Sequence, residues 1–247
     1  MANLRVATFN CRGLCKETHR LALFDHLRSS NIHVYCLQET HSTANDETNW
    51  TSEWGSTGAL FHSNGKGDRT NGVAILLYHP DLAIISWHSD NEGRILTADI
   101  SLRSETFHLT NIYAPQSGYT IQFRLQFFWF LILLYIFPHP TIFTGDFNMV
   151  ENPGLDRDPP STTNDPTRKL RDLCSTFNLR DTFRLNYGNS RLFTCPQGQS
   201  QSRLDRFYVC GQVTSSLEYT TPSLSSDHDI VGLETRGFEV STHGKDL

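Results

Sequence analysis

The stretch Thr141–Asn148, which reads Thr-Ile-Phe-Thr-Gly-Asp-Phe-Asn, constrains the fold more than any other part of this chain. Its first residues predict a buried strand that delivers polar side chains at its carboxyl end. In extended backbone, residues i and i+2 point the same way, so we expect Asp146 and Asn148 to share a face while Phe147 enters the opposite layer. Such a pair can hold a phosphate, a water molecule or a metal ion. The alternative is an Asx turn that only ends the strand.

Chain length and charge limit the possible organisation and partners. With 247 residues, of which 38% are hydrophobic, and no evident linker, we expect one large domain over residues 1–236 and a frayed polar tail over residues 237–247. The net charge of −5 excludes a protein-wide basic field, so a nucleic-acid partner would require a local basic patch and bound cations. The six cysteines lack zinc-like spacing, and Leu4–Phe9 alternates like a strand rather than a leader peptide, which favours reduced thiols in an intracellular protein.

Strand patterns recur along the chain, and many of them end in a polar side chain. We predict strands at residues 4–10, 34–39, 58–62, 72–78, 82–88, 94–102, 106–115, 191–194, 203–209 and 225–231, with β structure throughout Trp50–Leu102. Helical spacing predicts helices at residues 19–30, 121–137 and 168–177, and residues 151–166 have the composition of a long loop. The polar strand ends are Asn10, Glu39, Tyr113, Asp146, Asn148, Asp205, Asp227 and His228.

The run Phe127–Phe137 consists of eleven apolar residues. A helix needs about 20 such residues to span a bilayer, so we expect a buried helix and no membrane partner. Because the run lacks a polar outer face, we also expect an exposed apolar patch there.

Taken together, these segments resemble the endonuclease/exonuclease/phosphatase superfamily, and within it most closely the endonuclease domain of LINE-type non-LTR retrotransposons, which are relatives of AP endonucleases and exonuclease III. The matching segments are Thr8–Asn10, Leu37–His41, Gly72–Leu76, Asn111–Pro115, Gly145–Asn148, Ser202–Asp205 and Ser226–His228. They extend over residues 4 to about 233.

The resemblance implies a DNase I-like fold: a four-layer α/β sandwich with two mixed sheets packed face to face, helices outside, and an active site at one edge. It also implies a Mg²⁺-dependent enzyme, with Mn²⁺ able to substitute, that nicks duplex DNA and leaves a 3′ hydroxyl and a 5′ phosphate. In a complete retroelement the 3′ hydroxyl would prime reverse transcription. We expect a nuclear location, no obligate protein partner, and a reverse transcriptase segment absent from these residues.

The resemblance assigns a task to each polar strand end. Glu39 would bind the metal ion, with Asp227 as a second contact to the ion or its waters. His228 would act as a base or as a protonated phosphate ligand, oriented by Asp205. The remaining assignments are water activation by Asp146, phosphate hydrogen bonds from Asn148 and Asn10, and phosphate or transition-state contact by Tyr113.

Further residues are candidates for holding the DNA substrate. Thr194 and Ser226 carry hydroxyls that could bind flanking phosphates. Gln116 stands where the family usually has Asn, and its side chain is one methylene longer than that of Asn. The candidate basic contacts are Lys66, Arg69, Arg191 and Arg203.

Three alternatives stay open from the sequence. The first is an AP endonuclease or 3′ to 5′ exonuclease of the DNA-repair type, although Arg12 stands where those enzymes have an acid. The second is a catalytically decayed remnant that binds DNA, which the apolar run and Gln116 keep open. The third is a phosphatase acting on inositol lipids or sphingomyelin, which would share the fold but not the motif sequences.

Overall fold

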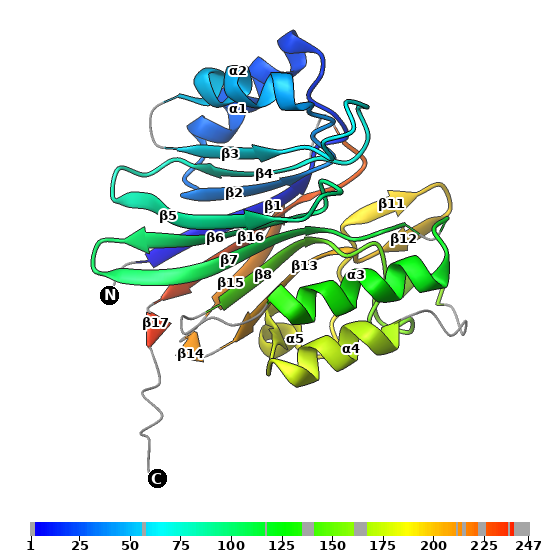
Figure 1. The fold of residues 1–247 in the computed structure, drawn as a ribbon. Helices are drawn as coiled ribbons and strands as arrows, with labels where there is room; N and C mark the ends of the chain where they lie inside the picture. Colours follow the sequence, from blue (N-terminus) through cyan, green and yellow to red (C-terminus); the bar gives the residue numbers. More distant parts are fainter. Residues whose placement is uncertain are drawn as a thin grey trace.

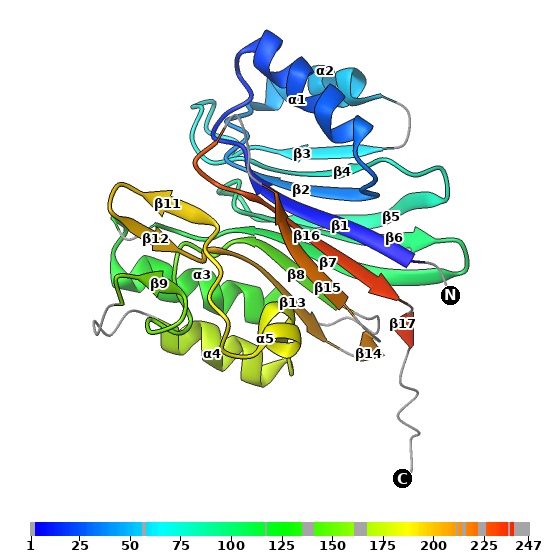
Figure 2. The same cartoon turned by 180° about the vertical axis from the view of Figure 1, so that it is seen from behind.

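Two six-stranded sheets packed face to face form the centre of the molecule (Figures 1 and 2). The computed structural model describes residues 3–55, 58–116, 118–134, 141–160, 167–210, 212–213, 216–221, 226–236 and 238–239. The first sheet has the order β15-β16-β1-β2-β4-β3, formed by β1 (Asn3–Asn10), β2 (Val34–Gln38), β3 (Ala59–His62), β4 (Val73–Leu77), β15 (Ser216–Thr221) and β16 (Ile230–Arg236). The second has the order β10-β13-β8-β7-β6-β5, formed by β5 (Leu82–Ser89), β6 (Ile95–Leu102), β7 (Glu105–Tyr113), β8 (Thr141–Asp146), β10 (Arg180–Asp181) and β13 (Asp205–Cys210).

Helices cover the outer faces of both sheets and complete four layers (Figure 1). The first sheet is covered by α1 (Glu17–Ser29) and α2 (Ala44–Trp54), and the second by α3 (Ile121–Leu134) and α4 (Thr167–Thr176). A short helix, α5 (Thr182–Tyr187), lies against β13 and β15. The expected four-layer α/β sandwich is confirmed.

The side-chain period of two along each strand separates the core into layers. In β8, Ile142 packs between the two sheets, whereas Phe143 packs under α3 and α4. In β2, Cys36 faces the space between the sheets and Leu37 faces α1 and α2. These strands are buried on both faces, which explains why the sequence reads as nearly continuous apolar runs.

Strand register brings the polar strand ends to one edge. Strands β1 and β2 are parallel, with Asn10 beside Gln38, and β7 and β8 are parallel, with Tyr113 beside Asp146. Strand β13 runs antiparallel to β8, so its first residue, Asp205, pairs with Asp146. Carboxyl ends of parallel strands and the amino end of an antiparallel neighbour meet at the same edge of a sheet, and this edge holds the candidate site.

Several local predictions were wrong. Residues 50–54 belong to helix α2 rather than to β structure. The sequence signal for this helix was Thr43 followed three residues later by Asp46, whose Oδ2 accepts hydrogen bonds from the Thr43 N–H and hydroxyl. The predicted strand at residues 191–194 is irregular. Instead, β11 (Cys195–Gln197) and β12 (Ser200–Ser202) form a hairpin that pairs with β9 (Arg157–Asp158), inside the predicted long loop.

The C-terminal region also differs from the prediction. Residues 226–228 form a bend, and the strand begins only at Ile230. Within the expected frayed tail, β17 (Phe238–Glu239) pairs with β14 (Gln212–Val213), whereas residues 240–247 lie outside the described part of the chain.

Helix α3 contains residues 127–134 of the apolar run, and residues 135–137 lie outside the described part of the chain. Phe127, Phe128 and Leu131 are buried against the second sheet, as expected for a core helix. The predicted exposed patch depends on side chains at residues 129–130 and 132–137, which lie outside the described set. Among the described helices, none has the length and hydropathy needed to cross a bilayer.

Candidate active site

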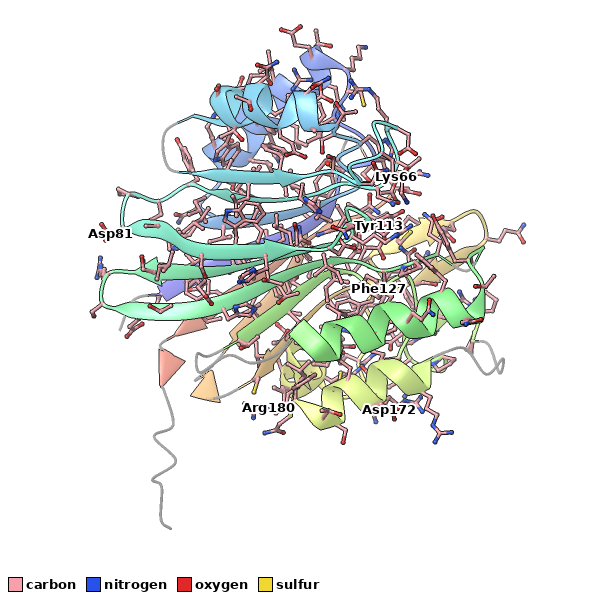
Figure 3. The ribbon with its side chains drawn as sticks, viewed as in Figure 1. Lys66, Asp81, Tyr113, Phe127, Asp172 and Arg180 are labelled. Carbon is pink, nitrogen blue, oxygen red and sulfur yellow. The ribbon has the colours of Figure 1, made fainter. Side chains whose placement is uncertain are left out.

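The candidate site lies at one end of the sandwich. In Figure 3, Tyr113 lies at this end together with Lys66, and Asp81 lies at the opposite end of the sheets. The segments that meet here are the ends of β1, β2, β7 and β8, the start of β13, and the bend at residues 226–228.

Glu39 follows β2 and is held in one orientation by three neighbours. Asn10 Nδ2 and the Tyr113 hydroxyl both donate to Glu39 Oε1, at 2.9 and 2.8 Å. His41 Nε2 lies 3.7 Å from the other oxygen, Oε2. Burial opposes ionisation, but the nearby His41 imidazole and the hydrogen bonds from Asn10 and Tyr113 outweigh it and lower the pKa of Glu39 to about 2. The residue also has a positive φ of 51°, so its position is imposed by the surrounding structure.

Asp146 is buried and bridges the two sheets. Its Oδ2 accepts a hydrogen bond from Asn10 Nδ2 at 3.0 Å, and its Oδ1 accepts one from the backbone N–H of Asn148 at 2.8 Å. The second bond is the Asx turn that the sequence offered as an alternative, so this segment forms both the turn and the site. Phe147 packs against Tyr208 in the outer core, as expected.

Asn148 does not continue the strand beside Asp146. Strand β8 ends at Asp146, and Asn148 has a positive φ of 48°. Its Nδ2 donates to the carbonyl of Ala114 at 2.8 Å. The expected extended backbone through Asn148 is therefore wrong, because the Asx turn redirects the chain.

His228 and Asp205 form a buried pair. His228 Nδ1 lies 2.8 Å from Asp205 Oδ2, and the Thr194 hydroxyl donates to the same oxygen at 2.6 Å. Thr194 is fully buried and its own oxygen accepts the backbone N–H of Asp205, at 3.1 Å. The expectation that Thr194 binds a flanking phosphate is wrong in this structure, because its hydroxyl positions Asp205 instead.

Two carboxylates face the His228 imidazole. On the side away from Asp205, His228 Nε2 lies 4.0 Å from Asp146 Oδ2. Burial opposes protonation of the imidazole, but the Asp205 carboxylate outweighs it and raises the pKa of His228 to about 12. Burial, together with the Asp205 carboxylate, raises the pKa of Asp146 to about 6. His228 is therefore a stable cation, and the neighbouring Asp146 carboxylate titrates near neutrality.

Ser226 and Gln116 connect the edge of the site to its centre. The Ser226 hydroxyl donates to the backbone carbonyl of Asn10 at 2.7 Å and accepts the backbone N–H of His228 at 3.1 Å. Gln116 Nε2 donates to the Tyr113 hydroxyl at 2.9 Å. Both side chains therefore hold other site residues in place.

Arg203 was predicted to contact substrate, and this prediction is wrong. Its side chain is fully buried and forms ion pairs with Asp156 through Nε at 2.9 Å and with Asp181 through Nη2 at 2.5 Å. It therefore anchors the loop before α4 and the start of α5 to β13. The sequence did not indicate that Arg203 is buried, because its two carboxylate partners are 47 and 22 residues away along the chain.

Four exposed basic side chains, Arg12, Lys66, Arg69 and Arg191, form ion pairs within the chain. Arg12 Nη1 forms an ion pair with Asp227 Oδ2 at 2.7 Å, which makes Asp227 a less available metal ligand than predicted. Lys66, Arg69 and Arg191 pair with Glu92, Asp46 and Asp158, respectively, and each keeps at least 41% of its side chain exposed.

The donor set at Glu39 fits Mg²⁺. The ion takes oxygen ligands, commonly one or two carboxylates, and keeps several waters. Glu39 is ionised across the physiological range, Asn10 and Tyr113 donate to Oε1, and His41 Nε2 lies 3.7 Å from Oε2, beyond hydrogen-bond distance. Glu39 Oε2 is therefore the carboxylate oxygen that would hold the ion.

Three residues near the site were not predicted. His41 lies in the matching segment Leu37–His41, so the motif itself contained a signal for it. Arg12 stands at the position where AP endonucleases have an acid, and its pairing with Asp227 has no signal in the sequence. Cys195 lies within hydrogen-bonding distance of His228. The sequence gave no signal for it, because the β11–β12 hairpin that begins at Cys195 was not predicted.

A comparison with known proteins found a relative of similar sequence. A protein of transposon TX1 from Xenopus laevis, described as an uncharacterized 149 kDa protein, is 29% identical over 240 residues, which cover 93% of this chain and 18% of that protein. The chain thus spans less than a fifth of that relative.

Two solved structures share the fold. The AP endonuclease LMAP from Leishmania major has a TM-score of 0.76 and 19% identity, with 95% of this chain and 88% of that chain covered. The endonuclease domain of TRAS1, a telomere-specific non-LTR retrotransposon, has a TM-score of 0.64 and 21% identity, with 94% and 98% covered. The sequence profile of the Endonuclease/Exonuclease/phosphatase family matches residues 7–228, and the chain belongs to this family of metal-dependent phosphodiesterases.

Proposed function

We propose that this chain is a Mg²⁺-dependent endodeoxyribonuclease that nicks one strand of duplex DNA and leaves a 3′ hydroxyl and a 5′ phosphate. The observation that carries the proposal is one continuous set of side-chain contacts. It runs from Glu39 through Asn10 to Asp146, and from there across 4.0 Å to the His228–Asp205 pair. A carboxylate for a metal ion, a carboxylate for water and a cation for phosphate thus lie within one site.

The pKa values of Asp146 and His228 favour a division of labour. With a pKa of about 6, Asp146 is mostly ionised at neutral pH and can accept a proton from the attacking water. His228 remains protonated, so it serves as a hydrogen-bond donor to a phosphate oxygen rather than as the base. The water oxygen forms the new bond to phosphorus, the bond to the 3′ oxygen breaks, and that oxygen takes up a proton from solvent.

Glu39 would hold the Mg²⁺ ion, with Asn10 and Tyr113 fixing its orientation. When bound, the ion would neutralise negative charge on the phosphate and the departing oxygen. The Asn10 amide donates hydrogen bonds to both Glu39 and Asp146. It therefore fixes the distance between the carboxylate proposed for the metal ion and the carboxylate proposed for the water. In this proposal Tyr113 acts chiefly through Glu39, to which its hydroxyl already donates.

Duplex DNA is the proposed partner, and the exposed cations Lys66, Arg69 and Arg191 are its proposed phosphate contacts. Because the chain is acidic overall, binding should depend on these few side chains and on bound cations. The similarity to a transposon protein supports a retroelement role, in which the new 3′ hydroxyl primes reverse transcription in the nucleus.

Relaxation of supercoiled plasmid in Mg²⁺ tests the proposal. We expect the wild type and His88→Ala, which alters an exposed histidine on β5, to nick at similar rates, and His228→Ala to lose at least about 10²-fold. Equal rates for His228→Ala and the wild type would overturn the site assignment. DNA binding without nicking by the wild type would identify a decayed remnant.

A second substrate separates the retroelement role from repair. We expect similar cleavage of an intact duplex and of the same duplex with one abasic site. A strong preference for the abasic duplex would favour the AP endonuclease alternative and contradict the retroelement assignment.

A further inference from the structure

A thiol, a carboxylate and an imidazole converge beside the proposed phosphate-binding position. One ligand atom each from Cys195, Asp227 and His228 lies within 4.8 Å of the others. Cys195 comes from the start of β11, and the other two come from the bend before β16, so the tertiary fold alone brings them together. Cysteine sulfur is a soft ligand that Mg²⁺ avoids, whereas Zn²⁺ accepts sulfur, nitrogen and oxygen together.

We propose that Cys195, Asp227 and His228 form an inhibitory Zn²⁺ site, in which the ion captures the imidazole that the nuclease needs for its substrate. Binding of the ion rests only on these residues, and the inhibition rests on the proposed function. The remaining coordination position would hold water, or the carboxylate of Asp146, which lies 4.0 Å from His228 Nε2.

The orientation of His228 suits a zinc ligand. Metal-binding histidines usually donate their other ring N–H to a carboxylate, which sets the tautomer and the ring plane. His228 Nδ1 is bonded to Asp205 Oδ2 at 2.8 Å, which leaves Nε2 as the nitrogen for the ion. The Thr194 hydroxyl on the same Asp205 oxygen provides a further layer of support.

One carboxylate oxygen of Asp227 has no hydrogen-bond partner among the described residues. Arg12 occupies Oδ2, whereas Oδ1 is shielded from solvent and has no hydrogen-bond partner among the described residues. A buried carboxylate oxygen without a partner is costly, and a bound cation would remove that cost. Asp205 Oδ1 is likewise buried without a hydrogen-bond partner among the described residues. The protein therefore neutralises only part of the negative charge around the proposed zinc site.

The geometry requires small adjustments. Tetrahedral Zn²⁺ with bonds of about 2.0–2.3 Å brings its ligand atoms to about 3.5 Å from one another. The present separations, at most 4.8 Å, would close by about an ångström through side-chain rotation. Cys195 binds as thiolate and His228 as neutral imidazole, so the thiol proton and the proton on His228 Nε2 both leave to solvent when the two bonds to zinc form.

Cobalt substitution tests the site without any reference to activity. Co²⁺ bound to a cysteine thiolate has a near-ultraviolet sulfur-to-metal charge-transfer band, and Zn²⁺ should displace it. We expect the band in the wild type and in Cys210→Ala, which removes a half-buried cysteine at the far end of β13, and its loss in Cys195→Ala and Cys195→Ser. No band in the wild type, or an equal band in Cys195→Ala, would overturn the proposal.

Plasmid nicking in Mg²⁺ with added Zn²⁺ tests the inhibition, each variant being compared with its own zinc-free rate. Because loss of a supporting residue alone weakens metal sites by about 10–100-fold, Cys195→Ala should raise the Zn²⁺ concentration for half-inhibition by at least about tenfold. Excess Mg²⁺ should not relieve the inhibition, because Glu39 and Cys195 select different ions. Zinc inhibition that is equal in Cys195→Ala, or that Mg²⁺ relieves, would contradict the inhibitory role. If no variant nicks at all, the proposed nuclease function fails, while the cobalt spectra still decide the metal site.

Discussion

His228 and Asp205 are joined by a 2.8 Å hydrogen bond between Nδ1 and Oδ2, inside a region where both side chains are buried. Since β13 pairs Asp205 with Asp146, the same contact also sets how far the imidazole lies from the water-activating carboxylate. The pair therefore controls both the charge and the position of the imidazole.

Replacing Asp205 with Asn should lower the pKa of His228 from about 12 towards or below its ordinary value of 6.5. The reason is that the main group favouring the imidazolium is gone while burial still opposes it. The pKa can be measured from the ring proton shifts of His228 by NMR, and nicking should fall by about 10²–10⁴-fold. Asp25→Asn, on the exposed face of α1, serves as the control. An unchanged His228 titration would show that Asp205 is not the cause.

The rate of nicking should depend on pH through Asp146. Because the pKa of Asp146 is raised to about 6, kcat/KM should rise about tenfold per pH unit below that value and level off above it. Asp146→Asn should be nearly inactive at all pH values. A profile that is flat between pH 5 and 7 would argue against Asp146 as the base.

Tyr113→Phe should raise the Mg²⁺ concentration needed for half-maximal nicking by about tenfold, because Glu39 loses one of the donors that orient it. Magnesium titration of the nicking rate measures the change. Tyr78→Phe, which alters a partly exposed tyrosine following β4, should leave the requirement unchanged. A lower rate at the same Mg²⁺ requirement would instead place Tyr113 on the phosphate.

Asp156→Asn should destabilise the fold by about 3–5 kcal/mol, because Arg206 would remain buried without its carboxylate and Arg203 would keep only Asp181. Burial opposes ionisation of Asp156, but Arg206 and Arg203 hold its pKa well below the ordinary 3.8. A depressed folded-state pKa means that this stabilisation is full above about pH 4 and is lost as the pH falls further. Urea unfolding at neutral and acidic pH measures both effects, and a loss below about 1 kcal/mol at neutral pH would contradict them.

Gly145→Ala should prevent stable folding. Gly145 has a φ of +136°, and an added Cβ would lie 1.9 Å from the carbonyl oxygen of Ile112 in the neighbouring strand. Overpacking and backbone strain together should cost more than about 3 kcal/mol. Thermal unfolding and soluble yield measure the effect, with Gly198→Ala, where a Cβ meets no atom within 4 Å, as the comparison that separates strain from steric clash. Similar stability for both variants would refute the close-approach argument.

Much of the site could be predicted because its chemistry lies at strand ends. The apolar period marked where strands β1, β2 and β8 stop, and Asn10, Glu39 and Asp146 at or just after these ends belong to the candidate site. The ordered series from Asn10 to His228 then predicted the family, and the family predicted the four layers. Local signals failed where the element was short or irregular, as in the β11–β12 hairpin and the bend at residues 226–228.

Hydrophobic period and residue type are local properties, so they predicted where strands end and which polar residues lie there, and the fold class followed from the family that the ordered motifs resemble. The contacts of each polar side chain became known from the three-dimensional fold. It placed Arg203 in the core rather than on DNA, paired Arg12 with Asp227, and set Cys195 beside His228. The physical reason is that burial and Coulomb interactions depend on distances between residues far apart in the chain, and no local pattern contains those distances.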